Sequence, residues 1–204
     1  MNTRIIITLL LFNQLAFGQE TPTTTSNASM ALDFCFINFP MMKRNYSGIN
    51  LEMKFFSDRK FMAGFTFNYV QGKVTKDLNY SFTEPILNHY EGAITVQYGL
   101  IRNPNAYIST SFSTGLVWNV YGDDATRDEL TQELLDKVTA TQFYIAPGAE
   151  FNFRLFPGMA APEIYFTAKL KYLLPLGYPR FGAPSDFAGY YIGAGVTLIG
   201  LIAE

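Results

Sequence analysis

The sequence predicts an all-β protein, an eight-stranded antiparallel up-and-down β-barrel that crosses a membrane. Segments of alternating apolar and polar residues recur along the chain, and most run about ten residues, whereas strands of soluble sheets usually have five or six. Charged residues make up only 16% of the chain and aromatic residues another 16%, while ordinary domains carry about 25% charged residues. Short and long connections alternate between the segments, which is typical of transmembrane barrels.

The N-terminus has the features of a Sec-type signal peptide. Arg4 supplies a positive charge, residues 5–12 form an apolar core, and Ala16 and Gly18 are the small residues of a cleavage site. Cys35, the only cysteine, cannot form a disulfide within the chain. We therefore expect a signal peptide, a polar periplasmic linker and a barrel over residues 1–18, 19–29 and 30–204.

Each expected strand has a period of two, which directs successive side chains to opposite faces. In KFMAGFTFNYVQ, Phe61, Phe65 and Tyr69 fall on one face, and Thr66 and Asn68 on the other. In chain order the strands are expected over 30–39, 47–56, 60–71, 90–101, 106–120, 140–156, 163–174 and 188–202. From the second strand on, each strand has apolar residues at alternating positions on one face. In chain order, examples are Leu51 and Met53; Phe65 and Phe67; Ile94 and Val96; Phe112 and Leu116; Phe143 and Phe151; Phe166 and Leu170; and Ile192 and Val196.

The connections alternate in length. SDRK, RNPN and PGMAAP are short and consist of turn-forming residues. The connections after the third, fifth and seventh strands are long, and only PMMKRNY after the first is modest. The prediction is therefore short periplasmic turns, long extracellular loops and both termini in the periplasm.

One long connection contains a helical candidate over residues 126–138. Leu130, Leu134 and Val138 have a spacing of four, with Thr126 as a plausible N-cap and Glu129 as its capping-box partner. An isolated helix this short is marginal in water, so it would need a surface to rest on.

Alternation alone does not separate a membrane barrel from a soluble sandwich or lipocalin-like barrel, in which the apolar face points inward. Three features favour the membrane: a polar face rich in small residues, charges of both signs on that face, and aromatic residues near strand ends. The expected belts comprise Tyr69, Tyr90, Trp118, Tyr121 and Tyr190 at the long-loop end, and Phe55, Tyr107, Phe153, Phe156 and Tyr165 at the short-turn end.

The charges of the polar face are the principal candidate site. An eight-stranded barrel has room only for side chains, and buried charges are stable when they pair. We expect an ion-pair network that closes the lumen, with a polar path for a small solute or ion as the alternative. Its members are Glu52, Lys54, Glu91, Glu150, Arg154, Lys169 and Lys171.

In its signal peptide, strand number, loop asymmetry and aromatic belts, the chain resembles the small Gram-negative outer-membrane barrels of the OmpA/OmpX type. The resemblance implies a location in the cell outer membrane, surrounded by outer-membrane lipid and lipopolysaccharide. One departure concerns the C-terminus. Such barrels commonly end in an aromatic residue, whereas GAGVTLIGLIAE ends in Glu204.

We expect no catalytic residue, no metal site and no cofactor. His89 is the only histidine and is expected at the barrel rim, where a lipid-modifying enzyme would need a serine and an acid beside it. One histidine and one cysteine cannot form a zinc cluster, and Asp123, Asp124 and Asp128 lack EF-hand spacing. The net charge of −2 provides no basic field for nucleic acid.

The expected function is that of a non-enzymatic outer-membrane barrel with a plugged polar lumen, whose loops serve surface recognition or protein contacts. Alternatives are an accessory subunit of a larger complex for secretion, assembly or uptake, a small-solute channel, and a lipid-modifying barrel enzyme. Apolar loop residues motivate the complex, because loops that meet only water need few of them. These contact candidates are Tyr80, Phe82, Ile86, Leu87, Leu130, Leu134, Tyr178 and Phe181.

Overall fold

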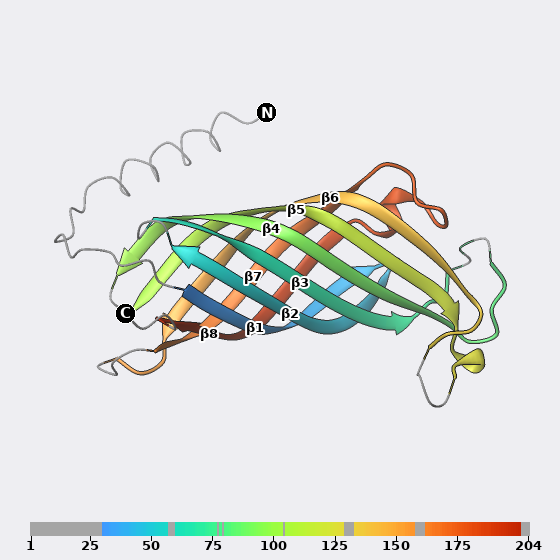
Figure 1. Ribbon diagram of the computed structural model, residues 1–204, viewed down its shortest axis with the longest axis horizontal. Helices are drawn as coiled ribbons and strands as arrows, with labels where there is room; N and C mark the ends of the chain where they lie inside the picture. Colours follow the sequence, from blue (N-terminus) through green and yellow to red (C-terminus); the bar gives the residue numbers. More distant parts are fainter. Residues whose placement is uncertain are drawn as a thin grey trace.

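Eight antiparallel strands form one closed sheet (Figure 1). Each strand pairs with the next along the chain, and β1 pairs with β8 to close the barrel, which confirms the predicted fold class. This computed structural model describes residues 30–56, 60–76, 78, 80–103, 105–128, 133–157 and 162–200. The predicted signal peptide and linker lie outside those residues. The strands are β1 (Met30–Met41), β2 (Arg44–Phe56), β3 (Phe61–Lys73), β4 (Pro85–Asn103), β5 (Ala106–Asp123), β6 (Lys137–Arg154), β7 (Glu163–Leu176) and β8 (Gly189–Ile199).

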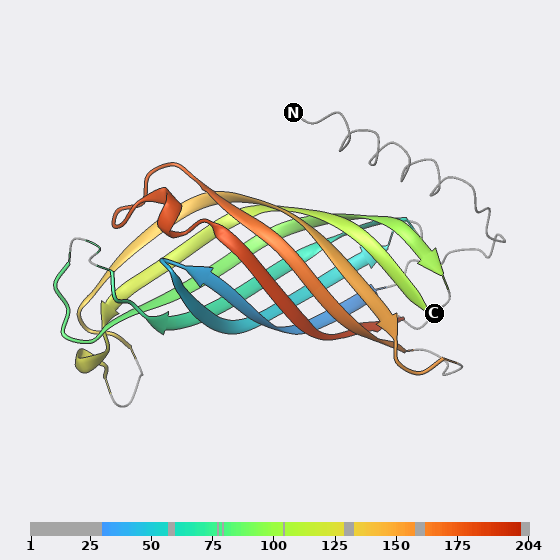
Figure 2. The same ribbon diagram turned by 180° about the vertical axis from the view of Figure 1, so that it is seen from behind.

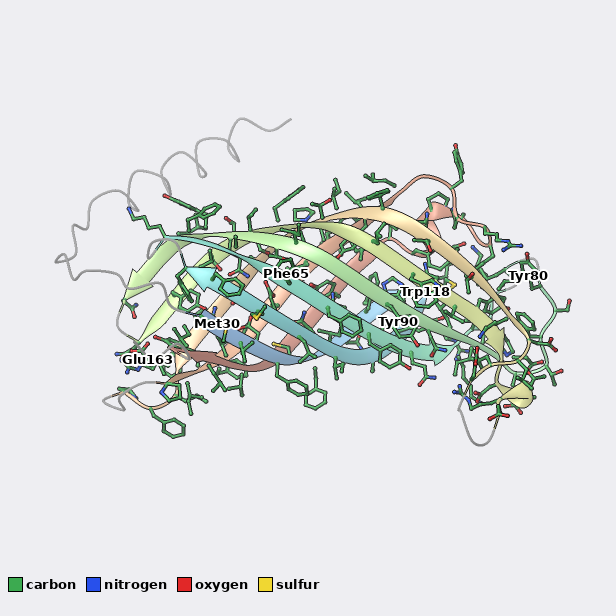
Figure 3. All side chains as sticks on the ribbon, in the orientation of Figure 1. Met30, Phe65, Tyr80, Tyr90, Trp118 and Glu163 are labelled. Carbon is green, nitrogen blue, oxygen red and sulfur yellow. The ribbon has the colours of Figure 1, made fainter. Side chains whose placement is uncertain are left out.

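The connections divide between the two ends of the barrel as predicted. The long β3–β4, β5–β6 and β7–β8 connections gather at one end together with the β1–β2 turn, and this end is called here the long-loop end. The β2–β3, β4–β5 and β6–β7 turns lie at the other end (Figure 2). Met30 and Glu163 lie at the short-turn end, and Tyr80 lies at the long-loop end (Figure 3). Within the described part of the chain, no helix is long and apolar enough to cross a bilayer.

The apolar face is the outer face on every strand. The outward-facing Phe36 is 69% exposed and Phe65 is 58% exposed, whereas residues of opposite parity, such as Asn68 and Thr95, are buried. Phe65, Tyr90 and Trp118 lie on the outside of the sheet (Figure 3). A soluble barrel would have the opposite arrangement, so the observed burial is that of a barrel whose surroundings are apolar.

The outer aromatic residues form the belt predicted at the long-loop end, with one exception. Tyr69 stacks on Tyr90 with ring centroids 5.0 Å apart, and Tyr90 lies 5.6 Å from Trp118 on the next strand. Tyr121, also predicted for this belt, is 1% exposed. Odd-numbered residues of β5 point inward, and Tyr121 is one of them.

The belt predicted at the short-turn end is correct in part. Phe55, Phe153 and Phe156 are exposed. Tyr107 and Tyr165, however, are each 6% exposed, and their rings meet inside the barrel with centroids 5.6 Å apart. The assignment to the outer belt was wrong because both residues share the parity of the inward-facing positions on β5 and β7.

The predicted helix over residues 126–138 is wrong for the described residues. A single turn of 3-10 helix covers Asp124–Thr126, Arg127 and Leu134 form an antiparallel bridge, and β6 already begins at Lys137. Extending β5 and β6 satisfies backbone groups along an existing ladder, whereas a short isolated helix gains little in water. Leu130 and Glu129 lie outside the described residues.

The barrel is not equally tall all around. β4 has 19 residues and β5 and β6 have 18 each, whereas β1 has 12 and β8 has 11. β1 and β2 are joined by only two residues, Met42 (φ 48°) and Lys43 (φ 62°). The long-loop rim is therefore low beside this hairpin and high beside β4–β6 (Figure 1).

Candidate functional site: a closed, charged lumen

Six charged side chains meet in the middle of the barrel. Three are acids and three are lysines, and each residue is at most 3% exposed. They project from β1, β2, β6 and β7 toward the barrel axis because all six have inward parity. We call this set the lumen network, and its members are Asp33, Glu52, Lys54, Glu150, Lys169 and Lys171.

Two lysines join all three acids. The Lys54 ammonium lies 2.6 Å from a carboxylate oxygen of Asp33 and 2.6 Å from one of Glu150. The Lys169 ammonium lies 2.6 Å from Asp33, 2.6 Å from Glu52 and 3.6 Å from Glu150. Each of these five buried charges thus contacts at least two of the opposite sign, which offsets the cost of burying it.

Strand register explains why the network must span the lumen. Asp33 lies directly opposite Glu52 on β1 and β2, and like charges in such positions destabilise a strand pair. Glu150 lies opposite Lys169 on β6 and β7. The two acids are therefore compensated by Lys169, which projects into the lumen from β7, two strands from β1 around the barrel. Lys171 completes the set, 3.7 Å from Glu52 and within 3.1 Å of the Ser113 hydroxyl.

The structure brings together five of the seven predicted network residues. Glu91 lies nearer the long-loop end with His89, and Arg154 pairs with Glu163 at the short-turn end, at 3.0 Å. Sequence reasoning missed Asp33, although its place between the outward-facing Leu32 and Phe34 was a usable signal.

Carboxylate oxygens of Asp33, Glu52 and Glu150 lie within 4.8 Å of one another, close enough to hold a metal ion. The Lys54 and Lys169 ammonium groups, however, lie 2.6 Å from these oxygens. They therefore take the position that a cation would occupy, and the network is an ion-pair cluster.

His89 lies inside the barrel and not in a rim loop, which corrects the prediction. β4 begins at Pro85, earlier than expected, so His89 is a strand residue with the inward parity of Glu91. It is fully buried, with Nδ1 2.7 Å from Asn119 Oδ1 and Nε2 2.8 Å from Glu91 Oε1. The other Glu91 oxygen accepts a hydrogen bond from Asn68 at 2.7 Å.

This arrangement does not have the form of a hydrolase site. Both ring nitrogens of His89 contact other side chains, Asn119 and Glu91, so within the described part of the chain neither nitrogen contacts a serine hydroxyl. A base in a nucleophilic triad needs such a contact. The geometry instead fits a buried polar cluster.

Apolar side chains fill the barrel mouth above this cluster. Phe181 and Phe187 enter from the β7–β8 connection, both at most 1% exposed, and Leu78 enters from the β3–β4 connection. The Phe181 ring lies 5.5 Å from Tyr121 and 5.8 Å from Phe187. We call this set the mouth plug, and it also includes Phe39 and Leu87.

Most of the predicted loop contact residues belong to this end of the barrel itself. Ile86 and Leu87 are buried residues of β4, and Leu134 is 3% exposed. Tyr80 and Phe82 are partly buried against the mouth plug. Of the described candidates, only Tyr178, at 94% exposure, faces solvent fully. The apolar loop residues therefore pack against the barrel, which removes much of the reason for inferring a partner from them.

Asp123 holds two of the long connections in place. Its carboxylate accepts backbone hydrogen bonds from Thr83 at 2.7 Å, Glu84 at 2.9 Å and Ala125 at 3.1 Å. The Thr83 and Glu84 donors favour the charged form, so the pKa of Asp123 lies below its usual value. A second link between connections is the ion pair of Lys76 with Asp186.

We predict that Asp123→Ala loosens the β3–β4 connection. The amides of Thr83 and Glu84 should exchange with deuterium about tenfold faster or more at pH 7, because each loses a charge-assisted bond. The unfolded pKa is about 3.9 and the folded pKa is lower, so the stabilisation is complete above about pH 4 and is lost as pH falls through the folded pKa. Wild-type protection that changed between about pH 5 and 8 would contradict this assignment.

Comparison with known proteins agrees with the architecture. The chain matches no known protein family and no curated protein sequence. Three solved structures are similar: a major outer membrane protein from Thermus thermophilus, OprG from Pseudomonas aeruginosa, and Neisserial surface protein A. The TM-scores are 0.59, 0.56 and 0.54, at 10%, 9% and 9% sequence identity. The matches cover 85%, 84% and 86% of this chain and 100%, 95% and 99% of those chains.

At such low identity the likeness concerns the fold alone, and it agrees with the outward apolar face and the alternating connections. The fold also supports a location in an outer membrane. The chain has the fold of the eight-stranded outer-membrane β-barrels.

Proposed function

We propose that this protein is a non-enzymatic, non-conducting outer-membrane barrel whose extracellular loops serve surface recognition or contacts with other proteins. The observation that carries the proposal is the filled lumen. Since the long loops are extracellular, the short turns and both chain ends are periplasmic. The chain is exported by its Sec-type signal peptide. Outer-membrane lipid and lipopolysaccharide surround the barrel, and nucleic acid is not a partner.

Side chains fill the lumen in successive layers. At the short-turn end Ala31, Met62, Tyr107, Tyr165 and Ile199 form a small apolar cluster. The lumen network follows, then the cluster around His89 and Glu91, and finally the mouth plug. A solute would have to displace paired buried charges and a packed aromatic cluster, and both displacements are costly.

The loop surface supports a role outside the barrel. Asp123 and the Lys76–Asp186 pair link the described parts of the long connections to one another, so these parts of the exposed surface are held in place before any partner arrives. Ordering in advance reduces the entropy cost of binding. Tyr178 is the most prominent exposed aromatic side chain of the described loop surface, at 94% exposure, and aromatic residues are enriched in binding sites.

Planar bilayers test the closed lumen. We expect wild-type protein to give no steady ohmic conductance, with a porin added afterwards to the same bilayer as a positive control. Glu52→Leu with Lys54→Leu should also stay near zero, because one acid and one lysine leave together and apolar side chains replace them. A steady wild-type conductance would overturn the proposal in favour of a channel.

Purification tests the role of the loops. If they contact a partner protein, extraction in mild detergent should retain that protein, and Tyr178→Ala should release it while the barrel stays folded. Elution of the wild type at the size of a monomer, with no other protein, would count against membership of a stable complex.

A further inference from the structure

Two neighbouring hollows lie on the outer face of β8, β1 and β2, and we call them together the groove. The hollow toward the short-turn end is lined by outward-facing apolar residues of these strands and β3, among them Leu32, Leu51 and Val196. The hollow toward the long-loop end is lined by Phe36, Ile49 and Ala194. The groove thus follows the direction in which an acyl chain lies in a bilayer.

The groove becomes polar where the apolar band ends. Asn38 and Ser47 line its long-loop end, lie directly opposite each other on β1 and β2, and are both exposed on the outer face. Amide and hydroxyl side chains are costly among acyl chains but suit the headgroup region. This pair therefore marks the boundary between acyl chains and headgroups on this side of the barrel.

Two cations lie just above that boundary. Lys43 and Arg44 form the tip of the β1–β2 hairpin, and both are exposed. Across the part of the chain that the structure describes, neither forms an ion pair. Roughly three to five residues of a tilted strand separate them from Asn38 and Ser47, a height of roughly 8–13 Å. That height corresponds to headgroup phosphates.

The low rim makes this position specific to one side of the barrel. β4, β5 and β6 carry their connections farther from the membrane, whereas the β1–β2 hairpin ends early (Figure 2). Met42 and Lys43 also occupy the left-handed region, where a two-residue hairpin usually has Asn-Gly. A lysine with positive φ costs stability, and this hairpin nevertheless has a lysine at its tip.

We propose that the groove and this hairpin bind one phosphorylated lipid of the long-loop leaflet. An acyl chain lies along Val196, Phe36 and Ala194, and the phosphate group lies against Lys43 at the hairpin tip. Arg44, which has inward parity opposite Met41, reaches the phosphate from over the low rim. Apolar groove and paired cations are complementary to the two halves of such a lipid. The proposal rests on the membrane orientation proposed above and does not depend on whether the lumen conducts.

Native mass spectrometry of the purified barrel with added bisphosphorylated lipid A tests the site. We expect one retained lipid per wild-type barrel. Lys43→Gln with Arg44→Gln should weaken retention by about tenfold or more, and Ala194→Trp, which fills the groove from the outside, should weaken it similarly. The matched control is Arg127→Gln with Lys137→Gln, which removes two cations from the β5–β6 side of the same end, across the barrel from the β1–β2 hairpin, and should leave retention within about twofold.

Three results would overturn the proposal. Equal retention of dephosphorylated lipid A would show that the cations play no part. Equal weakening by the control pair would show a general charge effect. Unchanged retention in Ala194→Trp would show that the groove is not occupied. The heat-modifiable mobility of each variant on gels shows whether it is folded, and variants with wild-type mobility carry the comparison.

Discussion

Replacing Gly115 by alanine is expected to abolish folding or to reduce the free energy of unfolding by about 3 kcal/mol or more. A Cβ atom at this position would lie 2.0 Å from the Gly92 carbonyl oxygen and 2.6 Å from the Ala93 Cα atom. Both are backbone atoms of the neighbouring strand, so relief requires breaking the β4–β5 ladder. Urea titration in detergent micelles, followed by heat-modifiable gel mobility, measures the effect.

Gly92→Ala is the matched control on the adjacent strand. Gly92 points outward, and a Cβ atom there would meet nothing within 4 Å. Alanine restricts the unfolded chain and should leave stability within about 0.5 kcal/mol of wild type or raise it slightly. Equal tolerance of both substitutions would mean that β4 and β5 do not approach as closely as described.

Lys169→Met is expected to cost about 3–5 kcal/mol, the usual cost of removing one partner of a buried ion pair. Methionine keeps most of the side-chain volume, so the loss reports charge rather than packing. The variant leaves Asp33, Glu52 and Glu150 facing one another with Lys54 and Lys171 as the remaining cations. Denaturant unfolding in micelles measures the change.

A double-mutant cycle separates the network from a general loss of lysine. Lys169→Met with Glu52→Gln removes one charge of each sign, so it should cost clearly less than the sum of the single variants. Coupling of at least about 1 kcal/mol is expected, because the two groups lie 2.6 Å apart and fully buried. Additive losses would contradict the network.

The direction of each strand face followed from the sequence because the period of two persists over long segments. Once Phe65 and Phe67 are outside, parity alone directs Thr66 and Asn68 inward. The same rule would have found Asp33 in the network and Tyr107 and Tyr165 in the lumen. Tyr107 and Tyr165 were misplaced because proximity to a strand end was given more weight than parity, and Asp33 was missed because parity was applied only from the second strand on.

Other features depended on contacts that no local pattern shows. His89 required knowing that β4 starts at Pro85, which depends on pairing with an extended β5. The mouth plug depends on two connections, carrying Leu78 and Phe181, folding into the same opening. The helical spacing of Leu134 and Val138 was a true periodicity, but tertiary strand pairing overrode it.

Fluorescence of Trp118, the only tryptophan, tests most directly that the apolar face lies against lipid. Trp118 lies on the outer face and is 51% exposed. In vesicles its emission should be blue-shifted, quenched by lipids brominated on their acyl chains, and insensitive to acrylamide. Red-shifted emission that acrylamide quenches and brominated lipid does not would contradict the membrane-embedded barrel.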